Sequence, residues 1–386
     1  MSDFELLNTE ITLNSSSVEV IEIPFHTPVH LPFGTIATRP SVWVATYGEV
    51  NGRDGVGVAE GTSLPMQIPM YDDYSGNLEP HVKHLLSPLE GQTFTLEEAR
   101  DVIATTDLGG NFATARMAAE TSLIDLATRT QNKTVYELIT DETLTEPLAI
   151  PYGKSIAESS YESITAAGLQ AIDNGAQRLK FKLSPNNHTA VVRGISELKQ
   201  AFPEASFMVD ANGTFDPENA EHIAILRTVD TLNLMMIEEP VSRGGQLSGL
   251  DAHRQLRQAM QLETPIALDD SIFTQQDART ALEEELGDII NLKPGRVGSF
   301  FDCIDIARIA KMQEKQIMVG GMFEATPGRT MTLTLAAFCL HEGFTIPGDV
   351  SLPQERLSAD LTETNLYLDS DQNVAFNPKS GWGYEL

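Results

Sequence analysis

Three acidic residues stand at the ends of consecutive short apolar stretches that have the length and composition of buried β-strands. They are Asp210 after Phe-Met-Val, Glu238 after Met-Met-Ile, and Asp269 after Ile-Ala-Leu. Parallel strands that lie side by side bring their carboxyl ends to one edge, where three ionised carboxylates require a cation. Oxygen-only ligands favour Mg²⁺, with Mn²⁺ as the alternative, and the lack of histidine or cysteine at these strand ends argues against zinc. A single acid here would as readily cap the following helix, but three in succession favour a metal site.

Three lysines accompany these acids. Lys180 and Lys182 are spaced by two in a strand, so both face the same side, and Lys293 ends a later strand on the other side of the acids. A charged side chain that points into the interior is costly unless it serves a function. A lysine acts as a base near neutral pH only if its pKa falls from about 10.4 towards about 7–8, and Lys180 with a bound cation would lower the pKa of Lys182. The alternative is that the lysines only pair structurally with the acids.

The residues that could do chemistry belong to a repeated strand–helix pattern that begins near Ala149. Each repeat joins a short apolar strand to an amphipathic helix, such as residues 188–202 or the helix predicted to open at Asp216-Pro217-Glu218. Eight evenly spaced strands predict a (β/α) barrel, whose catalytic groups lie at the carboxyl ends of the strands. The predicted strand ends are Tyr152, Lys182, Asp210, Glu238, Asp269, Lys293, Gly320 and Pro347.

The N-terminal part has a different pattern. Strand-like alternation over 18–26, 42–50 and 56–60, with a hairpin turn at Asn51-Gly52, predicts a small antiparallel meander. Helices should follow, because Thr95-Leu-Glu-Glu98 is a capping box and residues 113–130 carry apolar residues at helical spacing.

Three parts of the chain follow from these patterns. We expect an α+β capping domain over 1–145, a barrel with the active site over 146–355, and a segment over 356–386 that returns to the capping domain. Two loops of the capping domain, predicted at 24–34 and 61–70, should close over the barrel and contact the substrate. The candidate substrate contacts in these loops are His26, His30, Met66 and Met70. Histidines in loops are, however, more often only solvated.

Composition excludes nucleic acid and membranes as partners. The chain of 386 residues has 55 acidic and 26 basic residues, and its net charge of −29 repels nucleic acid and anionic lipid. No apolar stretch approaches the roughly 18 residues of a membrane span, and no signal peptide is visible. The two cysteines, Cys303 and Cys339, lie in helix-like apolar context, which predicts buried thiols and fits a cytoplasmic protein.

Five motifs, in order along the chain, resemble those of the enolase superfamily in its muconate-lactonizing subgroup. They are Lys180-x-Lys, Asp210-x-Asn, Glu238-Glu-Pro, Asp269-Asp-Ser and Asn291-x-Lys-Pro-Gly-Arg-Val-Gly. Gly320-Gly-Met-Phe-Glu and Pro347-Gly-Asp-Val-Ser are similar to the o-succinylbenzoate synthase / N-acylamino acid racemase family. The resemblance covers the whole chain, since 116–129 resemble the long helix of the capping domain and 381–386 resemble the usual C-terminal ending.

The resemblance implies a modified barrel, (β/α)7β, with an α+β capping domain. It implies that Asp210, Glu238 and Asp269 bind Mg²⁺. Lys182 and Lys293 become an acid/base pair on opposite faces of the substrate, and Lys180 becomes their helper. Further residues expected around the ion or the substrate are Asn212, Asp270, Gly321, Met322 and Glu324.

Three positions depart from the family pattern. Asp270 stands where the family usually has glutamate, and Glu239 stands where it often has glutamine. The last strand offers Asp349-Val-Ser351 and lacks the Asp-x-Asp with which dipeptide epimerases hold an ammonium group. This difference argues against dipeptide epimerisation.

The implied chemistry is Mg²⁺-dependent removal of a proton α to a carboxylate, through an enediolate. Loss of water, as in o-succinylbenzoate synthesis, and racemisation of an N-acylamino acid use the same residues, so the sequence does not separate them. The alternatives are a muconate-type cycloisomerase and a non-catalytic protein that reuses the fold. We expect a small-molecule carboxylate as the partner and a homo-oligomer as the assembly.

Overall fold

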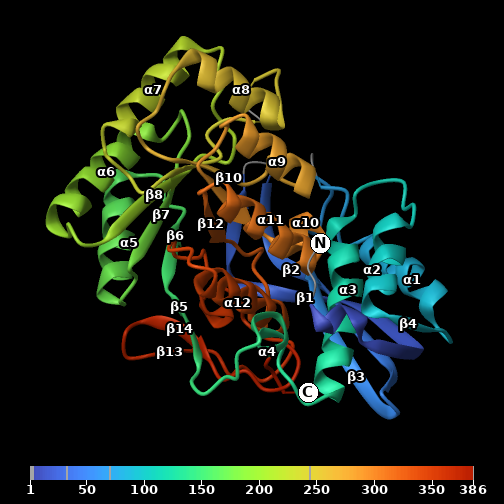
Figure 1. Cartoon of the computed structure of the whole chain (residues 1–386). Helices are drawn as coiled ribbons and strands as arrows, with labels where there is room; N and C mark the ends of the chain where they lie inside the picture. The colour runs from blue at the N-terminus through green and yellow to red at the C-terminus, as the bar shows by residue number, and fades with distance from the viewer. Residues whose placement is uncertain (1–3, 32–33, 69–70, 243–244, 386) are drawn as a thin grey trace.

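The computed structural model describes residues 4–31, 34–68, 71–242 and 245–385. Met70 and residues 32–33 of the predicted loops therefore lie outside the described residues, as does the side chain of His30. Three sheets organise the chain: a four-stranded antiparallel sheet, a seven-stranded parallel sheet and a small three-stranded sheet. In Figure 1 the antiparallel sheet and its helices form one lobe, and the parallel sheet with its helices forms the other.

The antiparallel sheet has the strand order β3-β2-β1-β4. Its strands are β1 Glu10–Leu31, β2 Gly34–Val50, β3 Arg53–Thr62 and β4 Thr93–Thr95. Asn51 and Gly52 both have positive φ, at 52° and 74°, and they join β2 to β3 with Val50 paired to Arg53. This geometry is the type I′ turn that an Asn-Gly pair favours, and it confirms the predicted hairpin.

The described part of the predicted 24–34 loop differs from the prediction, because residues 24–31 extend β1 and Gly34 begins β2. The pairing of the two strands shifts between Pro24 and Val29, so four residues of β1 stand against one residue of β2. Proline is tolerated at such a bulge, since a bulge interrupts the ladder of backbone hydrogen bonds in any case. Phe25, within the bulge, pairs instead with Leu357 of the C-terminal segment.

Helices accompany this sheet, most of them after β3 along the chain. They are η1 Glu5–Asn8, α1 Leu78–Leu86, η2 Ser87–Leu89, α2 Leu96–Thr105, α3 Ala113–Thr130 and α4 Val135–Thr140. The capping box is confirmed, because Thr95 Oγ1 accepts a hydrogen bond from Glu98 N and Glu98 Oε2 accepts one from Thr95 N. Helix α3 has the predicted bounds and is almost entirely buried, since it lies between this sheet and the barrel.

The seven parallel strands follow one another in space as they do in sequence. They are β6 Gly153–Ile156, β7 Arg178–Lys182, β8 Ser206–Asp210, β9 Ile237–Glu238, β10 Ile266–Leu268, β11 Ile289–Leu292 and β12 Gln316–Val319. The helices between and after them are α5 Tyr161–Asp173, α6 His188–Ala201, α7 Ala220–Asp230, α8 Gly249–Ala259, α9 Gln275–Glu283, α10 Pro294–Val297, α11 Phe300–Met312 and α12 Thr326–His341. The predicted α/β barrel with a separate capping sheet is confirmed.

The first and last strands of the barrel differ from the prediction. The chain before Tyr152 forms β5 Leu148–Pro151, which pairs antiparallel with β14 Asn373–Phe376, and the first parallel strand begins only at Gly153. The eighth strand is reduced to one parallel bridge between Gly320 and Asp349. Pro347 cannot donate a ladder hydrogen bond, which limits the pairing there.

The start of α7 also differs from the prediction. Asp216, Pro217 and Glu218 form a turn instead of the first helical residues, with Glu218 N donating to Asp216 Oδ1 at 2.9 Å. The helix begins at Ala220, because Asn219 caps it by accepting a hydrogen bond from Glu221 N at 2.9 Å.

The C-terminal segment contacts both lobes. Its elements are η3 Pro353–Glu355, β13 Tyr367–Leu368 and β14, and the two strands add to β5. Beyond them, Trp382 Nε1 donates to Thr121 O at 3.1 Å and Tyr384 Oη donates to Val58 O at 2.8 Å. These contacts lie in the capping lobe, whereas the domain boundaries at 145 and 355 remain predictions.

Two buried acids of the capping lobe lie at the N-termini of barrel helices. Glu60 on β3 is 2% exposed and accepts hydrogen bonds from Ala325 N at 3.0 Å and Gly328 N at 2.9 Å, at the start of α12. Glu120 on α3 accepts one from Ser299 Oγ at 3.0 Å, at the start of α11. Backbone N–H groups at a helix start lack partners within the helix, so these acids tie the two lobes together.

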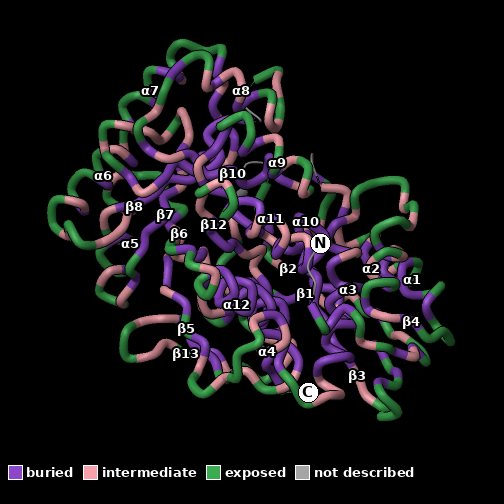
Figure 2. The backbone as a smooth tube through the Cα atoms, viewed as in Figure 1, coloured by how far each residue is buried: buried purple, intermediate pink, exposed green. Residues whose placement is uncertain are grey.

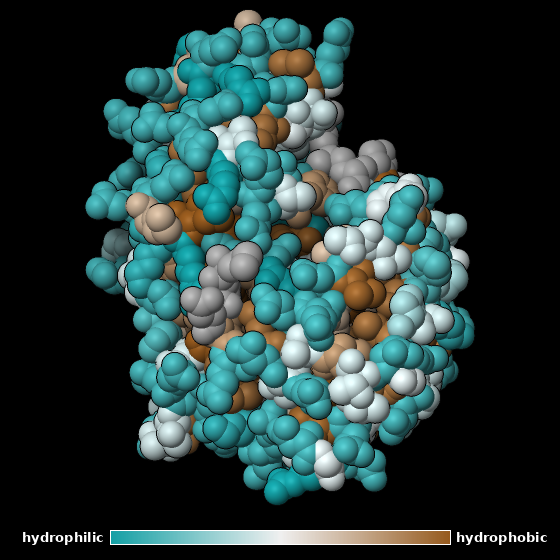
Figure 3. Space-filling view, turned by 45° about the vertical axis from the view of Figure 1, so that its right-hand side comes forward, coloured by the Kyte–Doolittle hydropathy of each residue, from teal (hydrophilic) through white to brown (hydrophobic). Residues whose placement is uncertain are grey.

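Buried residues run along the barrel strands and through α3 and α12 (Figure 2). The face in Figure 3 is largely hydrophilic, with hydrophobic side chains confined to separate patches, as the high charge predicts. Across the described residues, no helix is both long and apolar enough to cross a membrane. Cys303 and Cys339 are buried free thiols, as predicted.

Candidate active site

A cavity of about 200 Å³ lies between the capping sheet and the carboxyl ends of the barrel strands. Its walls come from both lobes. The capping lobe contributes Val29, Arg39, Leu64, Ile68 and Tyr71, and the barrel contributes the predicted lysines and two of the predicted acids. The chemistry-bearing residues therefore lie under a roof that strands β1 and β2 and the segment after β3 provide.

Strand order brings the three predicted acids together. Asp210 and Glu238 are the last residues of β8 and β9 and pair directly across the ladder, while Asp269 follows the last residue of β10. Each acid is at most 2% exposed. Three buried carboxylates on adjacent strand ends are costly unless positive charge compensates them.

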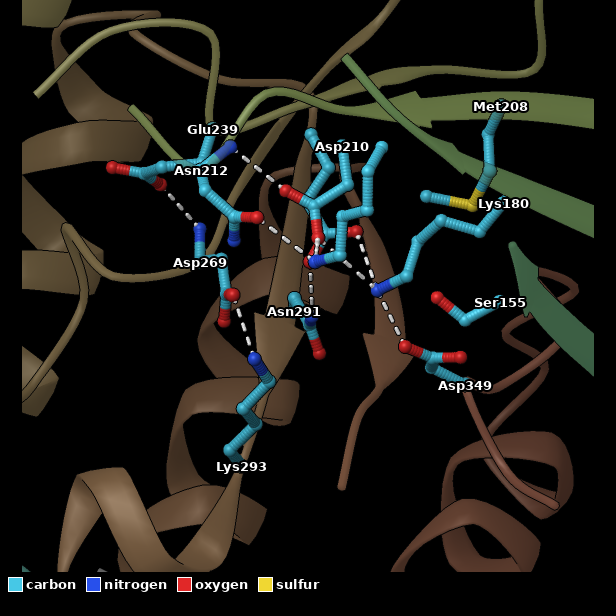
Figure 4. Close-up of polar contacts among 12 residues, drawn as sticks. Ser155, Lys180, Met208, Asp210, Asn212, Glu239, Asp269, Asn291, Lys293 and Asp349 are labelled. Atoms are coloured by element: carbon cyan, nitrogen blue, oxygen red, sulfur yellow. Dashed lines mark hydrogen bonds and ion pairs between the residues drawn. The ribbon is translucent and has the colours of Figure 1, made fainter. Parts of the chain in front are cut away.

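Lysines supply that charge. Lys182 Nζ donates to Asp210 Oδ2 at 2.6 Å and to Asn212 Oδ1 at 2.9 Å, while Lys293 Nζ donates to Asp269 Oδ2 at 2.6 Å. Lys180 Nζ lies 3.1 Å from Glu238 Oε2 and 3.5 Å from Asp210 Oδ2. In Figure 4, Lys180 and Lys293 reach towards the acids from opposite sides.

Burial and neighbouring charges together set the pKa values of these groups. Burial raises the pKa of Glu238 to about 7, and the neighbouring charge of Asp210 adds to the increase. Burial would also raise the pKa of Asp269, but Lys293 and Arg296 hold it well below its usual value. Burial would lower the pKa of Lys293, but Asp269 raises it above its usual value. The predicted lowering of a lysine pKa depends on a bound cation and stays a prediction.

The donor set fits a hard divalent ion. Asp210, Glu238 and Asp269 offer only oxygen atoms, which Mg²⁺ prefers, and their mutual repulsion is what a cation relieves. Within the described part of the chain, no three acidic, histidine or cysteine side chains are spaced to hold an ion as they stand. The acids turn instead towards ammonium groups, and Lys180 Nζ bridges two of them.

Asp349 and Arg178 belong to this site, although no role was predicted for either. Lys180 Nζ forms an ion pair with Asp349 Oδ2, and Arg178 Nη2 donates to Asp349 Oδ1 at 3.0 Å. Arg178 precedes Lys180 by two residues in β7, so the alternation that placed the two lysines inside the barrel also places Arg178 there. This spacing was the signal in the sequence.

Asn291 and Arg296 also hold the acids in place. Asn291 Nδ2 donates to Glu238 Oε1 at 2.8 Å, and the Arg296 guanidinium contacts Asp269 Oδ1 and the carbonyl of Asn291. Both residues lie in the Asn-x-Lys-Pro-Gly-Arg motif around Lys293, but the motif alone does not show what they contact.

Glu239 is a buried anchor for the loop that carries Asp269. Its carboxylate accepts hydrogen bonds from Asp269 N at 2.7 Å and Ser271 Oγ at 2.5 Å. Burial would raise the pKa of Glu239, but hydrogen bonding to His253 and Ser271 lowers it below its usual value. Glu239 thus acts only as an acceptor here, and it positions Asp269 from behind.

Asp270 links the barrel to the roof of the cavity. Tyr71 of the capping lobe donates from Oη to Asp270 Oδ1 at 2.8 Å, and its ring packs edge-on against Phe273. Asp270 also lines the cavity, and its predicted role beside the ion or the substrate stays a prediction.

The Gly321–Glu324 loop forms one wall of the cavity. Gly321 and Met322 line it, whereas Glu324 lies behind them and accepts a hydrogen bond from Met322 N at 2.7 Å. Glu324 also pairs with Arg329 at 3.0 Å, directly beneath Gly321, where a Cβ would lie 2.7 Å from Arg329 Nη1. Glu324 therefore shapes the loop and Gly321 allows the close approach.

The predicted loop contacts are brought to the cavity only in part. Val29 and Ile68 line it, but His26 is exposed and contacts Gln354 O through Nε2 at 3.2 Å. Met66 is 38% exposed and is not among the residues that line the cavity. The 61–70 loop supplies Ser63, Leu64 and Ile68 to the lining, whereas Val29 comes from the extended strand β1.

Known proteins resemble the chain in sequence and in fold. Residues 164–386 match the domain family described as Enolase C-terminal domain-like. The o-succinylbenzoate synthase of Bacillus subtilis is 32% identical over 212 residues, which are 55% of this chain and 53%, about half, of that protein. The N-succinylamino acid racemase of Thermus thermophilus is 26% identical over 355 residues, which cover 92% of this chain and 89% of that protein. A substrate-liganded L-Ala-D/L-Glu epimerase from Bacillus subtilis shares the fold, with a TM-score of 0.81, 22% identity and coverage of 97% of this chain and 98% of that one.

Proposed function

The chain belongs to the enolase superfamily, and from this premise we propose that it removes a proton from the carbon next to a substrate carboxylate, through an enediolate. Its relatives are named as a synthase, a racemase and an epimerase, so the chain is an enzyme and not the structural protein that the sequence left open. The proposed reaction is either the loss of water, as in o-succinylbenzoate synthesis, or the racemisation of an N-acylamino acid.

One observation carries this proposal. Lys182 and Lys293 are held by different acids, Asp210 and Asp269, each at 2.6 Å, on strands that are not neighbours of each other. A substrate carboxylate between these acids would place its α-carbon between two ammonium groups. Two proton carriers on two sides of one carbon are what abstraction and return of an α-proton require.

Asp210, Glu238 and Asp269 would hold Mg²⁺, or Mn²⁺ in its place. When bound, the ion neutralises negative charge that develops on the substrate carboxylate as the proton leaves. Asn291 and Arg296 would fix the acids against the pull of the ion, because they already hydrogen-bond Glu238 and Asp269. Asn212 Oδ1 accepts a hydrogen bond from Lys182 Nζ while Asn212 N donates to Asp210 Oδ1, so Asn212 helps to hold the lysine beside the acid.

The lysines perform the proton steps. In racemisation, one of Lys182 and Lys293 accepts the α-proton through neutral Nζ, and the other donates a proton from its ammonium to the opposite face. In loss of water, one lysine accepts the α-proton and then donates it to the departing hydroxyl, while the other stabilises the intermediate by its charge. Both routes use the same residues, so the substrate decides between them.

Exchange of α-protons with solvent tests the proposal directly. The enzyme with Mg²⁺ is incubated in D₂O with a panel of N-acylamino acids and hydroxy acids, and loss of the α-proton signal is followed by ¹H NMR. We expect the wild type to exchange the α-proton of at least one of these two substrate classes. Lys182→Ala and Lys293→Ala should each lose exchange on one face of the α-carbon. Lys311→Ala is the control and should keep exchange, because it removes a remote lysine paired with Glu342. A folded, Mg²⁺-loaded enzyme that exchanges no α-proton across the panel would refute the proposed chemistry. Formation of an alkene or of the second enantiomer then distinguishes dehydration from racemisation.

A further inference from the structure

Lys180 is surrounded by carboxylates. The residue is 3% exposed, and its Nζ forms ion pairs with Asp349, with Glu238 at 3.1 Å and with Asp210 at 3.5 Å. Two of these acids are proposed ligands of the metal ion, and the third lies on the far side of the ammonium group (Figure 4). The position of this one ammonium group therefore decides whether the carboxylate oxygens of Glu238 and Asp210 are available to a metal ion.

Asp349 is itself held firmly on the side away from Lys180. Its Oδ1 accepts a hydrogen bond from Arg178 Nη2 at 3.0 Å, and its backbone N donates to Val319 O at 2.8 Å. The same Arg178 nitrogen donates to Gly348 O at 3.0 Å. A Cβ at position 153 would overlap the Arg178 guanidinium, so Gly153 leaves the space that this arrangement needs. Asp349 can therefore receive an ammonium group without moving.

Lys180 and a divalent ion compete for the same oxygen atoms. An ammonium group on Glu238 and Asp210 must withdraw when an ion binds there, because the two positive charges repel each other. A buried ammonium group without a partner is costly, so it needs another carboxylate close to its present position. Asp349 is that carboxylate, since it already contacts Lys180 Nζ and lies on the other side from the proposed metal ligands.

We propose that Asp349 is a positioning residue that holds Lys180 aside, so that Glu238 and Asp210 remain available to a divalent ion. This inference rests on the proposed function, because it needs an ion at those acids. Without the charge of Asp349, Lys180 settles on Glu238 and Asp210, and an incoming ion has to displace it. The chain from Gly153 through Arg178 to Asp349 then serves metal binding from a distance, without touching the ion.

Binding of Mn²⁺ alone tests this role apart from activity. The free Mn²⁺ signal is measured by electron paramagnetic resonance for the chelator-treated protein, with Mg²⁺ as competitor. Asp349→Asn keeps the shape and the acceptor for Arg178 but removes the charge, and we expect Mn²⁺ affinity to fall about tenfold, the factor associated with one charge-assisted hydrogen bond. In a Lys180→Met background the same change should alter the affinity by no more than about twofold, because the competing ammonium is gone.

Asp288→Asn is the matched control. Asp288 also lies between an arginine and a lysine, Arg257 at 3.1 Å and Lys315 at 3.4 Å, but it precedes β11 and so belongs to the opposite end of the barrel. This variant should bind Mn²⁺ as the wild type does. Lys180→Met alone gives a second test, which does not depend on whether Asp349→Asn folds. This variant should bind Mn²⁺ no more weakly than the wild type, because the competing ammonium group is gone.

Several outcomes would overturn the inference. They are wild-type affinity in folded Asp349→Asn, an equal loss in the Lys180→Met background, and weaker binding by Lys180→Met alone. Failure of the wild type itself to bind Mn²⁺ or Mg²⁺ would instead refute the proposed function. The two failures are therefore distinguishable.

Discussion

Glu60 should make this protein less stable as the pH rises. Burial raises the pKa of Glu60 to about 7 although hydrogen bonds from Ala325 N and Gly328 N favour its ionised form. In the unfolded chain the carboxyl releases its proton near its ordinary value of 4.5. Between these two values the folded state binds more protons than the unfolded state, so the free energy of unfolding falls as pH rises from about 4.5 to about 7 and is level above.

The size of the effect follows from the two pKa values. A difference of about 2.5 units at about 1.36 kcal/mol per unit gives about 3 kcal/mol over the whole window. Glu60 is 2% exposed, so solvent screening removes little of this value. Glu60→Gln removes the titrating carboxyl group and replaces one of its two acceptor oxygens by an amide NH₂. One backbone N–H at the start of α12 then lacks an acceptor, which lowers the free energy of unfolding by about 1–3 kcal/mol.

Urea unfolding of wild type and Glu60→Gln at pH 5, 6, 7 and 8, in the presence of chelator, measures this contribution. We expect wild type to be the more stable at pH 5 and its advantage to shrink by about 2.5 kcal/mol by pH 8, because part of the loss has already occurred below pH 5. Taking the difference between the two proteins removes other titrating groups, including Glu120, whose pKa burial also raises to about 7. Glu97→Gln, an exposed change in the first turn of α2, is the control and should show a constant difference. An advantage of wild type over Glu60→Gln that stays constant or grows with pH would refute the reasoning.

Three further predictions concern the site. Asp269→Asn should abolish both turnover and Mn²⁺ binding in a protein whose circular dichroism is unchanged, and turnover that persists in excess chelator would contradict the metal assignment. Lys293→Ala should still exchange the α-proton of one enantiomer in D₂O but lose interconversion by about 10²–10⁴-fold, with Lys182→Ala as its mirror image, whereas equal loss for both enantiomers would leave a single base. Tyr71→Phe removes the 2.8 Å hydrogen bond between roof and barrel, so KM in steady-state kinetics should rise about fivefold with little change in kcat, and an unchanged KM would show that the bond does not help to bind substrate.

Strand-end residues could be predicted from the sequence because their rule is local. A short apolar run locates the strand, its last residue locates the barrel mouth, and successive strands become neighbours, so Asp210, Glu238 and Asp269 had to meet. The Asn51-Gly52 turn could also be predicted from local sequence, because a two-residue hairpin turn of this type needs positive φ at both residues and Asn and Gly adopt it readily.

Features that depend on distant partners were missed or wrong. Residues 24–34 read as a loop because they contain prolines, but the bulge is filled by pairing with Leu357, more than 300 residues away. Asp349 was noted only because position 351 is a serine and not the second aspartate of an Asp-x-Asp motif. Its ion pair with Lys180 could not be predicted, because the two residues meet only once the barrel has closed. Arg296 lies in a recognised motif, yet its contact with Asp269 depends on how α10 is placed.

The contacts of Trp382 and Tyr384 have a consequence for biosynthesis. Their partners Thr121 and Val58 leave the ribosome 261 and 326 residues earlier. At a translation rate of roughly 5–20 residues per second, Tyr384 is synthesised about 16–65 seconds after Val58, and their hydrogen bond cannot form before then. During that time the capping sheet lacks part of its own core, so a chaperone that shields nascent apolar surface has its longest opportunity there. Synthesis that stops after α12 would leave the seven parallel strands without the Gly320–Asp349 bridge and the capping sheet without Trp382 and Tyr384.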